Sequence, residues 1–562
     1  CARCVRICKE VVGANALGLV KRGFETYVAP SLGNKLSDTN CESCGMCISA
    51  CPTAAMSENV PFKPGPVETV PVNSVCNYCS VGCEITYHKK GNFIWRVTGN
   101  EGMVNKDGNI CRFARFGYQY MNDKSRITKP LLKENGKFKE ISFEEAFSII
   151  AEKCNPQNAN ETALFAGARL SNEELFLIKK LAQKAIQTKN ISSFHYLGRG
   201  LGYNENSSFN TTFEQIKGAE KIFILGSETN KDNAVAGFMI YNEHYLKNVP
   251  LIQITTIADT AMNKKVNDTI KIKSYYHFVK AANHYLIAGG KQNSVYINSH
   301  IKGFEEYKKS VLSESFETLA AKSGASADVI KNFADDYNNT QNAIIVFAEK
   351  NVSANASFEI KNLAIITGKL GKTSMGIISL KEKNNSEGLL NSGIINDNNL
   401  PSLLEAGKIK NLLIFGEDPI GCAIDKKQIS SVFEKANFIL VQEYFLTETA
   451  KAATLVLPAS FPVETGGSFT NTQRVIQNFQ KEIFSPLEKC NISQLTSILK
   501  KFNINSEEDI NTEMLSDIAA NKSNSVDLNF TTEDNEKRIF EHGCDALTLR
   551  FNEYFNKLTA NN

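Results

Sequence analysis

The chain has 562 residues, with 63 Lys and Arg against 60 Asp and Glu and a hydrophobic fraction of 42%. This composition excludes collagen-like and low-complexity chains, and the length suggests three or four domains of about 150 residues each. The small net charge of +3 gives no reason to expect a nucleic acid or an anionic membrane surface as partner. No apolar run approaches the roughly 20 residues that span a bilayer.

Cysteine is concentrated near the start of the chain, where 11 of the 15 cysteines lie within the first 111 residues. Disulfides, structural zinc and iron–sulfur clusters are the three interpretations of such density. Disulfides fit poorly, because no signal peptide is visible and the long remainder holds only four more cysteines. The run Cys41-x2-Cys44-x2-Cys47-x3-Cys51-Pro52 is typical of two-cluster ferredoxins and favours clusters.

A second, incomplete copy of that run opens the chain. Cys1, Cys4 and Cys8 reproduce its last three positions, so that the first cysteine would precede residue 1. With no initiator Met either, we expect an N-terminally truncated chain. In two-cluster ferredoxins the fourth cysteine of each run serves the other cluster. We therefore expect Cys8, Cys41, Cys44 and Cys47 to hold one 4Fe-4S cluster, and Cys1, Cys4 and Cys51 to hold another that lacks a ligand.

A third cysteine group follows a proline-rich stretch, residues 59–71, that we interpret as a stiff linker. The strand-like runs 85–87 and 92–97, split by Lys90-Gly91, predict a hairpin that returns the last cysteine to the others. One more 4Fe-4S cluster is the favoured interpretation, and a zinc ribbon is the alternative. The group comprises Cys76, Cys79, Cys83 and Cys111.

Beyond these cysteines, short apolar runs alternate with helical patterns such as residues 173–188. The runs predict parallel strands covered on both faces, hence a doubly wound α/β body with ligands at the C-terminal strand ends. Two runs end in glycine, at Gly226 and Gly416. His88 and His195 are interpreted as structural or surface residues. The runs are residues 221–225, 251–255, 343–347, 412–415 and 438–441.

With these motifs in hand, the sequence resembles the molybdopterin oxidoreductases over nearly its whole length. Residues 1–56 resemble the two-cluster ferredoxin domain of NAD-linked formate dehydrogenases, iron hydrogenases and complex I-type subunits. Residues 76–117 and 126–130 resemble the cluster-binding entry domain, and residues 445–449, 455–459 and 467–472 resemble the large domain. The resemblance implies a ferredoxin-like domain over 1–58, a linker over 59–71, a small β-rich 4Fe-4S domain over 72–130, an α/β body over 131–482 and a tail over 483–562 without assigned chemistry.

Three departures from the family pattern imply that molybdopterin is absent. Formate dehydrogenases of this family hold molybdenum or tungsten through a Cys or selenocysteine next to a His, where this chain has Gly198 and Arg199. The pterin-holding Asp-Pro-Arg is replaced by residues 255–257, Thr-Thr-Ile, and the C-x-K-G lysine by Phe113. We also expect the charges that clamp the pterin pyrophosphates to be missing. The vestigial pterin positions would be Gly226, Ser227, Gly416 and Asn471.

This pattern is similar to the iron–sulfur subunit of NADH-quinone oxidoreductase (complex I) whose large domain keeps the molybdopterin-enzyme fold without the metal. The resemblance implies three 4Fe-4S clusters that pass electrons from an NADH- and flavin-binding partner toward a quinone module. It also implies a cytosol-facing protein that meets the membrane only through its complex. The complete second cysteine run is more usual in formate dehydrogenases and hydrogenases. The rival interpretations are a molybdenum or tungsten formate dehydrogenase α subunit and a non-redox zinc-binding scaffold.

Overall fold

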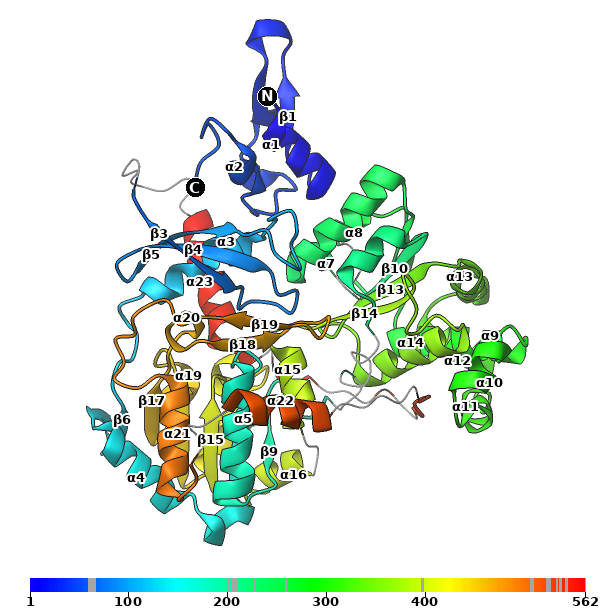
Figure 1. The fold of residues 1–562 in the computed structure, drawn as a ribbon. Coiled ribbons are helices and arrows are strands. Elements are labelled where there is room, and N and C mark those ends of the chain that lie inside the picture. The colour runs from blue at the N-terminus through cyan, green and yellow to red at the C-terminus, as the bar shows by residue number, and fades with distance from the viewer. Residues whose placement is uncertain are drawn as a thin grey trace.

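A narrow N-terminal projection, a small three-stranded domain and two α/β units make up the molecule (Figure 1). The architecture is known from a computed structural model. It describes residues 1–58, 67–199, 203, 210–226, 228–257, 260–395, 399–505, 510–521, 527–531, 534, 538–540 and 544–560. No helix within these ranges has the length and apolar character needed to cross a bilayer.

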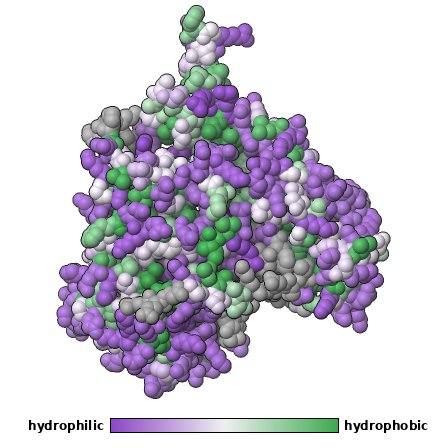
Figure 2. Space-filling view, viewed as in Figure 1, coloured by the Kyte–Doolittle hydropathy of each residue, from purple (hydrophilic) through white to green (hydrophobic). Residues whose placement is uncertain are grey.

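The N-terminal unit is a hairpin flanked by two short helices. Helix α1 (Arg3–Arg6) continues into a π-helical turn (Ile7–Val11), strands β1 (Leu17–Val20) and β2 (Tyr27–Pro30) pair antiparallel, and α2 (Met46–Ala50) packs against α1. Phe24 in the turn between β1 and β2, and Leu32 just after β2, have fully exposed side chains. Figure 2 shows the projection standing clear of a largely hydrophilic surface.

The next domain is an antiparallel sheet in the order β3-β4-β5, formed by β3 (Val70–Val75), β4 (Glu84–Lys90) and β5 (Phe93–Gly99). The predicted hairpin is confirmed, with Gly91 between β4 and β5 at a φ of 60°. The linker prediction is wrong for residues 70 and 71, because Pro71 pairs with His88 in β3. Edge strands tolerate proline, since its missing N–H interrupts no ladder. Residues 59–66 of that linker lie outside the described ranges. Helix α3 (Arg112–Phe116) and a 3₁₀ segment (Gly117–Asn122) complete the domain.

The first α/β unit contains a seven-stranded sheet in the order β7-β6-β17-β16-β15-β8-β9. Its five strands from β17 to β9 run parallel, while β6 and β7 add an antiparallel edge. The strands are β6 (Leu131–Glu134), β7 (Lys137–Glu140), β8 (Thr162–Ala166), β9 (Ile191–Ser192), β15 (Asn411–Phe415), β16 (Phe438–Glu443) and β17 (Leu455–Pro458). The main helices are α4 (Phe143–Lys153), α5 (Asn172–Lys180), α18 (Lys426–Glu434) and α21 (Asn491–Lys501).

The second α/β unit is inserted between β9 and β15 of the first. Its five strands are all parallel, in the order β12-β11-β10-β13-β14. They are β10 (Lys221–Leu225), β11 (Leu251–Thr255), β12 (Asp268–Lys271), β13 (Ala343–Ala348) and β14 (Gly376–Leu380). The longer helices are α8 (Ala234–Lys247), α9 (Tyr275–Ala288), α13 (Ala327–Asn339) and α14 (Ala354–Ile366).

The shorter elements fill the connections. They are α7 (Thr229–Asp232), α10 (Ser294–His300), α11 (Phe304–Val311), α12 (Phe316–Ser323), α15 (Ser386–Asn391), α16 (Leu400–Glu405), α17 (Pro419–Cys422), α19 (Glu448–Ala452), α20 (Pro462–Thr465), β18 (Gly467–Thr470), β19 (Ile476–Phe479), α22 (Ile510–Ala520) and α23 (Ala546–Ala560). Strands β18 and β19 pair as a separate antiparallel hairpin.

The predicted doubly wound body is confirmed, and it consists of two parallel sheets rather than one. All five predicted apolar runs are strands, and β8, β13, β14 and β15 are buried along their whole length. The predicted helix over 173–188 begins one residue earlier, after the capping side chain of Ser171, and widens into a π-helical turn (Leu181–Ile186). Helix α21, in the segment expected to be a tail, packs against α4 and α5 and belongs to the body.

The central strands of the seven-stranded sheet are buried along their whole length. We expect Leu413→Ala, in the middle of β15 and fully buried, to lower the free energy of unfolding by about 2–5 kcal/mol. Leu246→Ala, at a 62% exposed position of α8, is the matched control and should change it by less than about 0.5 kcal/mol. Denaturant titration measures both. Equal effects at the two positions would contradict the assignment of the core.

Candidate functional site

The third cysteine group gathers at one end of the three-stranded sheet. Cys76, Cys79 and Cys83 lie on the loop between β3 and β4, which closes through a 2.9 Å hydrogen bond from Cys76 N–H to Cys83 O. Cys111 is the N-cap of α3. The four sulfurs lie close enough for a charge on one to act on the others.

The surroundings of these four sulfurs favour metal-bound thiolates. Burial raises the pKa of Cys79 to about 12 and the pKa values of Cys76, Cys83 and Cys111 above the usual value, so the free thiols keep their protons at neutral pH. Backbone N–H groups nevertheless point at three of the sulfurs, including that of Tyr78 toward Cys76. Iron would displace the protons, and the thiolate sulfurs would accept hydrogen bonds from these N–H groups, as in iron–sulfur sites. The residues therefore fit a 4Fe-4S cluster.

The predicted partner of the second cysteine run also lies where expected. Cys8 acts electrostatically on Cys41 and Cys47, so the π-helical turn after α1 brings it to the loop before α2. Burial raises the pKa of Cys44 to about 12 and that of Cys47 to about 11. Ala16 N–H lies 3.3 Å from Cys8 Sγ, and Ser43 N–H lies 3.4 Å from Cys41 Sγ. As in the Cys76 group, backbone N–H groups thus point at sulfurs of this set.

The remaining N-terminal cysteines are more open. Cys1 is exposed, Cys4 is buried, and Cys51 ends α2. Met56 N–H lies 3.5 Å from Cys51 Sγ, and such hydrogen bonds lower the pKa of this thiol to about 7. Helix α1 carries Cys4 against α2, but binding of a cluster by Cys1, Cys4 and Cys51 stays a prediction.

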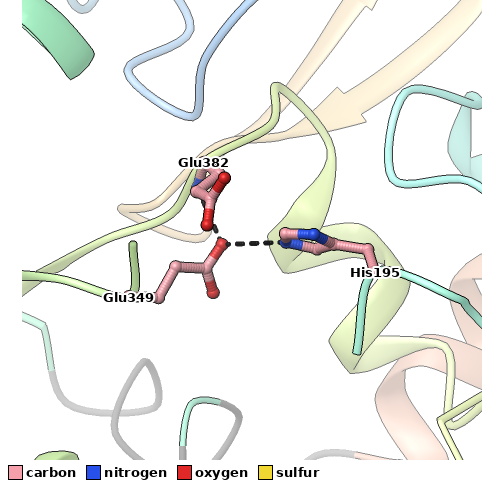
Figure 3. Close-up of side chains that lie close together, drawn as sticks. All are labelled: His195, Glu349 and Glu382. Carbon is pink, nitrogen blue, oxygen red and sulfur yellow. Dashed lines mark hydrogen bonds and ion pairs between the residues drawn. The ribbon is translucent and has the colours of Figure 1, made fainter. Parts of the chain in front are cut away.

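A buried charged cluster occupies the place where the carboxyl ends of the two parallel sheets meet. Figure 3 shows His195, from the loop after β9, facing Glu349 and Glu382, which follow β13 and β14. His195 Nε2 lies 3.5 Å from Glu349 Oε1, and Tyr196 Oη donates to Glu349 Oε2 at 2.9 Å. One possible ligand atom from each of His195, Glu349 and Glu382 lies within 4.8 Å of the others.

Basic side chains already balance this cluster. Arg199 Nη2 donates to Glu349 O at 2.7 Å, and its Nη1 lies 3.7 Å from Glu382 Oε1. Burial alone would raise the pKa of Glu349, but His195, Lys381 and Arg199 hold it well below its usual value. The carboxylates thus have cationic partners within the chain itself, which a bound metal would have to displace.

The turn that carries His195 and Arg199, after β9, is fixed by a carboxyl group that follows β15, two strands away in the same sheet. Glu417, which follows Gly416 at the end of β15, accepts hydrogen bonds from Ser193 Oγ at 2.6 Å and from the N–H groups of Phe194 and His195. Gly198 and Arg199 occupy the positions at which the family resemblance puts the metal ligand and its catalytic His. Neither supplies a thiolate, and Arg199 is engaged with Glu349 and Glu382, so these residues do not fit that metal centre.

A small cavity separates these strand ends from the Cys76 group. It measures about 90 Å³, well below the roughly 300 Å³ at the lower end for cofactor pockets. One wall is aromatic, because Phe113 packs against Tyr78 and Phe551 with ring centroids 5.5 and 4.6 Å apart. This aromatic packing narrows the space between the strand ends and the Cys76 group.

Basic groups line this cavity, which differs from the expectation that charges are missing there. Arg169 Nε donates to Asp545 Oδ1 at 2.8 Å, and Lys383 Nζ lies 2.5 Å from Asp545 Oδ2. Burial would raise the pKa of Asp545, but Arg169 and Lys383 hold it far below its usual value. Arg169 also donates to Tyr78 O at 2.8 Å. Through these bonds, residues near the C-terminal end connect the body to the Cys76 loop.

The predicted pterin positions lie on different elements of the fold. Gly226 ends β10 in the five-stranded sheet with a φ of 60°, whereas Gly416 ends β15 in the seven-stranded sheet with a φ of 66°. Asn471 follows β18 and is buried, and its Nδ2 donates to Gln477 Oε1 at 3.2 Å. Ser227 lies outside the described residues.

Sequence reasoning misses His195, Asp545 and Arg169 as members of a site. It interprets His195 as structural or surface, and it gives the segment after residue 482 no chemistry. The polar residues after Gly416 are a usable signal, because Glu417 is the group that fixes the His195 turn. Asp545 offers none, since its partner Arg169 lies 376 residues away in sequence.

Two family models match this chain. Residues 126–501 match the molybdopterin oxidoreductase model, and residues 70–123 match the molybdopterin oxidoreductase Fe4S4 domain. The second match covers all four cysteines of the Cys76 group and supports at least one 4Fe-4S cluster. It also begins at β3, in agreement with the corrected boundary of the small domain.

The chain is similar to several known proteins. It is 26% identical to the NADPH-Fe(3+) oxidoreductase subunit alpha of Geobacter sulfurreducens over 86% of this chain and 61% of that one. It is 29% identical to a formate dehydrogenase subunit alpha of Methanocaldococcus jannaschii over 79% and 73% of the two chains. The fold is shared with acetylene hydratase from Pelobacter acetylenicus, with a TM-score of 0.58 and 14% identity over 77% and 70%. This chain thus spans about three fifths of the length of the Geobacter relative.

A buried carboxyl at the end of β16 predicts a pH-dependent stability. Burial raises the pKa of Glu443 from near 4.5 to about 8. The protonated form therefore contributes stability that is complete below about pH 4.5 and is lost as the pH rises through about 8. In Glu443→Gln the side chain stays neutral at every pH. Between pH 6 and pH 9 the free energy of unfolding of this variant should therefore fall by about 2 kcal/mol less than that of the wild type. Denaturant titrations with the same pH slope for both proteins would contradict this.

The Asp545 carboxylate is expected to hold α23 on the body. Asp545→Asn leaves Arg169 and Lys383 buried without a counter-charge, which should cost about 3–5 kcal/mol and expose α23 to limited proteolysis. Glu140→Gln, which removes an exposed partner of Lys129, is the control and should cost less than about 1 kcal/mol. Unchanged protease resistance of Asp545→Asn would show that the ion pair does not anchor the helix.

Proposed function

The chain belongs to the molybdopterin oxidoreductase family, and from that premise we propose that it is an iron–sulfur electron-transfer subunit without a molybdenum centre. Electrons would come from an NADH-oxidising, flavin-binding partner and pass toward a quinone module at the cytosolic side of a membrane complex. Bound 4Fe-4S clusters supply one-electron transfer. The ligand sets are Cys76, Cys79, Cys83 and Cys111; Cys8, Cys41, Cys44 and Cys47; and Cys1, Cys4 and Cys51.

One observation carries this proposal. Cys41, Cys44 and Cys111 line a single cavity of about 310 Å³, so members of two different ligand sets face the same space. Neighbouring sets are what a chain of electron carriers requires. By contrast, the position of the family's metal ligand holds Gly198, followed by the guanidinium of Arg199 that binds Glu349 O.

The N-terminal projection supports docking of a partner. Exposed apolar side chains gather on it, with Leu19, Phe24, Tyr27 and Leu32 all more than half exposed. Apolar groups on a narrow hairpin are unusual for a free surface and typical of an interface. The hairpin contacts α1, which carries Cys4, so a donor bound there would be near the outermost ligand set (Figure 1). The name of the Geobacter relative, which refers to NADPH, is consistent with a nicotinamide as the electron source.

A second function, oxidation of formate, is favoured by another cavity. This space of about 540 Å³ is lined by Arg199, Lys350 and Arg538 together with one acidic residue, Glu382, and the three cationic side chains suit a small anion. The Methanocaldococcus relative carries the name of formate dehydrogenase. The absence of a thiolate at residue 198 weighs against this function for the present chain.

Metal analysis of the anaerobically purified protein tests the two functions. We expect about 12 irons per complete chain, no molybdenum or tungsten, and dye reduction only with the NADH-oxidising partner present. Cys111→Ser should remove about four irons, whereas Cys490→Ser, which changes a lone half-buried cysteine, should remove none. One molybdenum or tungsten per chain with formate-dependent dye reduction would establish the second function instead. Zinc without iron would refute both.

A further inference from the structure

One arginine lies between two of the cysteine groups. Arg115 is in α3, and its backbone N–H donates to Cys111 O at 3.0 Å. Its side chain reaches the N-terminal unit, where Nε donates to Cys44 O at 3.0 Å and Nη2 lies 3.8 Å from Met46 Sδ. Arg115 is only 4% exposed. Arg115 thus bonds through its backbone to Cys111 of one group and through its side chain to Cys44 of the other.

The neighbouring backbone leaves room for this side chain. Gly45 follows Cys44 and has a φ of 71°, and a Cβ at this position would lie 2.3 Å from Arg115 Cδ and 2.6 Å from its Nε. Any other residue would therefore push Arg115 away from Cys44. The glycine permits both the left-handed turn before α2 and the close approach of the guanidinium.

The charge of Arg115 acts on both groups. Burial lowers the pKa of Arg115, while Cys44, Glu58, Cys111 and Cys47 favour its charged form. Sets of four thiolates that hold clusters are anionic, and reduction adds one more negative charge to each. A buried guanidinium between two such sets stabilises the reduced form of both, because electrostatic interactions are strong where water is excluded.

We propose that Arg115 is a positioning residue that couples the Cys44 and Cys111 ligand sets and raises the reduction potentials of the clusters they hold. The inference rests on the proposed function, since it needs both clusters. It assigns to Arg115 a role that domain docking alone does not require. Docking has a separate contact, in which Lys265 Nζ donates to Val12 O at 2.7 Å and pairs with Glu42.

Redox titration of the full-length protein followed by electron paramagnetic resonance tests the proposal. Dithionite supplies one electron to each cluster, and Arg115→Gln should reduce the equilibrium constant for reduction about tenfold at both sites, which is about 59 mV for one electron. Arg115→Lys keeps the charge and should recover most of this shift. Gly45→Ala, which displaces the Arg115 side chain, should give a shift in the same direction as Arg115→Gln.

Two controls separate coupling from unfolding and from net charge. The magnetic interaction between the two reduced clusters should persist in Arg115→Gln, because Lys265 still holds the N-terminal unit in place. Lys106→Gln removes a positive charge of the same domain from a side chain that is 57% exposed. It should leave the equilibrium constant for reduction at both sites within twofold of the wild-type value.

The outcomes are distinguishable. Unchanged potentials at both sites in Arg115→Gln, with two intact signals, would overturn the role of Arg115 while the proposed function stands. A shift at one site only would show that the residue tunes one cluster and does not couple two. A wild-type protein that binds iron at neither set would overturn the proposed function and this inference together.

Discussion

Enclosure of four cysteine thiols beside the three-stranded sheet is the constraint on which the rest of the structure depends. Burial makes free thiolates unfavourable there, yet backbone N–H groups point at sulfurs of Cys76, Cys79 and Cys111. Such an arrangement is stable when iron takes the place of the protons. The body supports this loop directly, because Ser80 Oγ donates to Lys381 O and Arg169 binds Tyr78 O. The position of the cysteine loop is therefore fixed by the α/β body.

The second organising feature is charge balance at the carboxyl ends of the two parallel sheets. In an open α/β fold this edge is where ligands bind. Here the charge of Glu349 is balanced by His195, Lys381 and Arg199, and Asp545 pairs with Arg169, so the chain provides its own counter-charges. Aromatic packing by Phe113 then narrows the space beside the Cys76 group. A fold that belongs to a family of molybdopterin enzymes can in this way serve as a rigid support for electron carriers.

Much of the architecture can be predicted, because its signals are local. Cysteine spacing predicts the proposed ligand sets, and continuous apolar runs mark the buried strands. The insertion of the second sheet between β9 and β15 has no local signal, since it depends on which strands pair across long stretches of chain. The pairs Arg169–Asp545 and Arg115–Cys44 escape prediction for the same reason. Pro71 misleads the prediction in another way. It suggests a linker, yet it lies in β3, because proline is allowed in an edge strand.

The central claim is that iron lies at the cysteine groups while the body holds no metal beside Arg199. Anomalous X-ray diffraction from crystals of the anaerobic protein, recorded at the iron and molybdenum absorption edges, locates each metal directly. We predict strong iron peaks among Cys76, Cys79, Cys83 and Cys111 and among Cys8, Cys41, Cys44 and Cys47, with no molybdenum peak near Arg199. A molybdenum peak at the edge where the two parallel sheets meet, or no iron peak at the cysteines, would contradict this account.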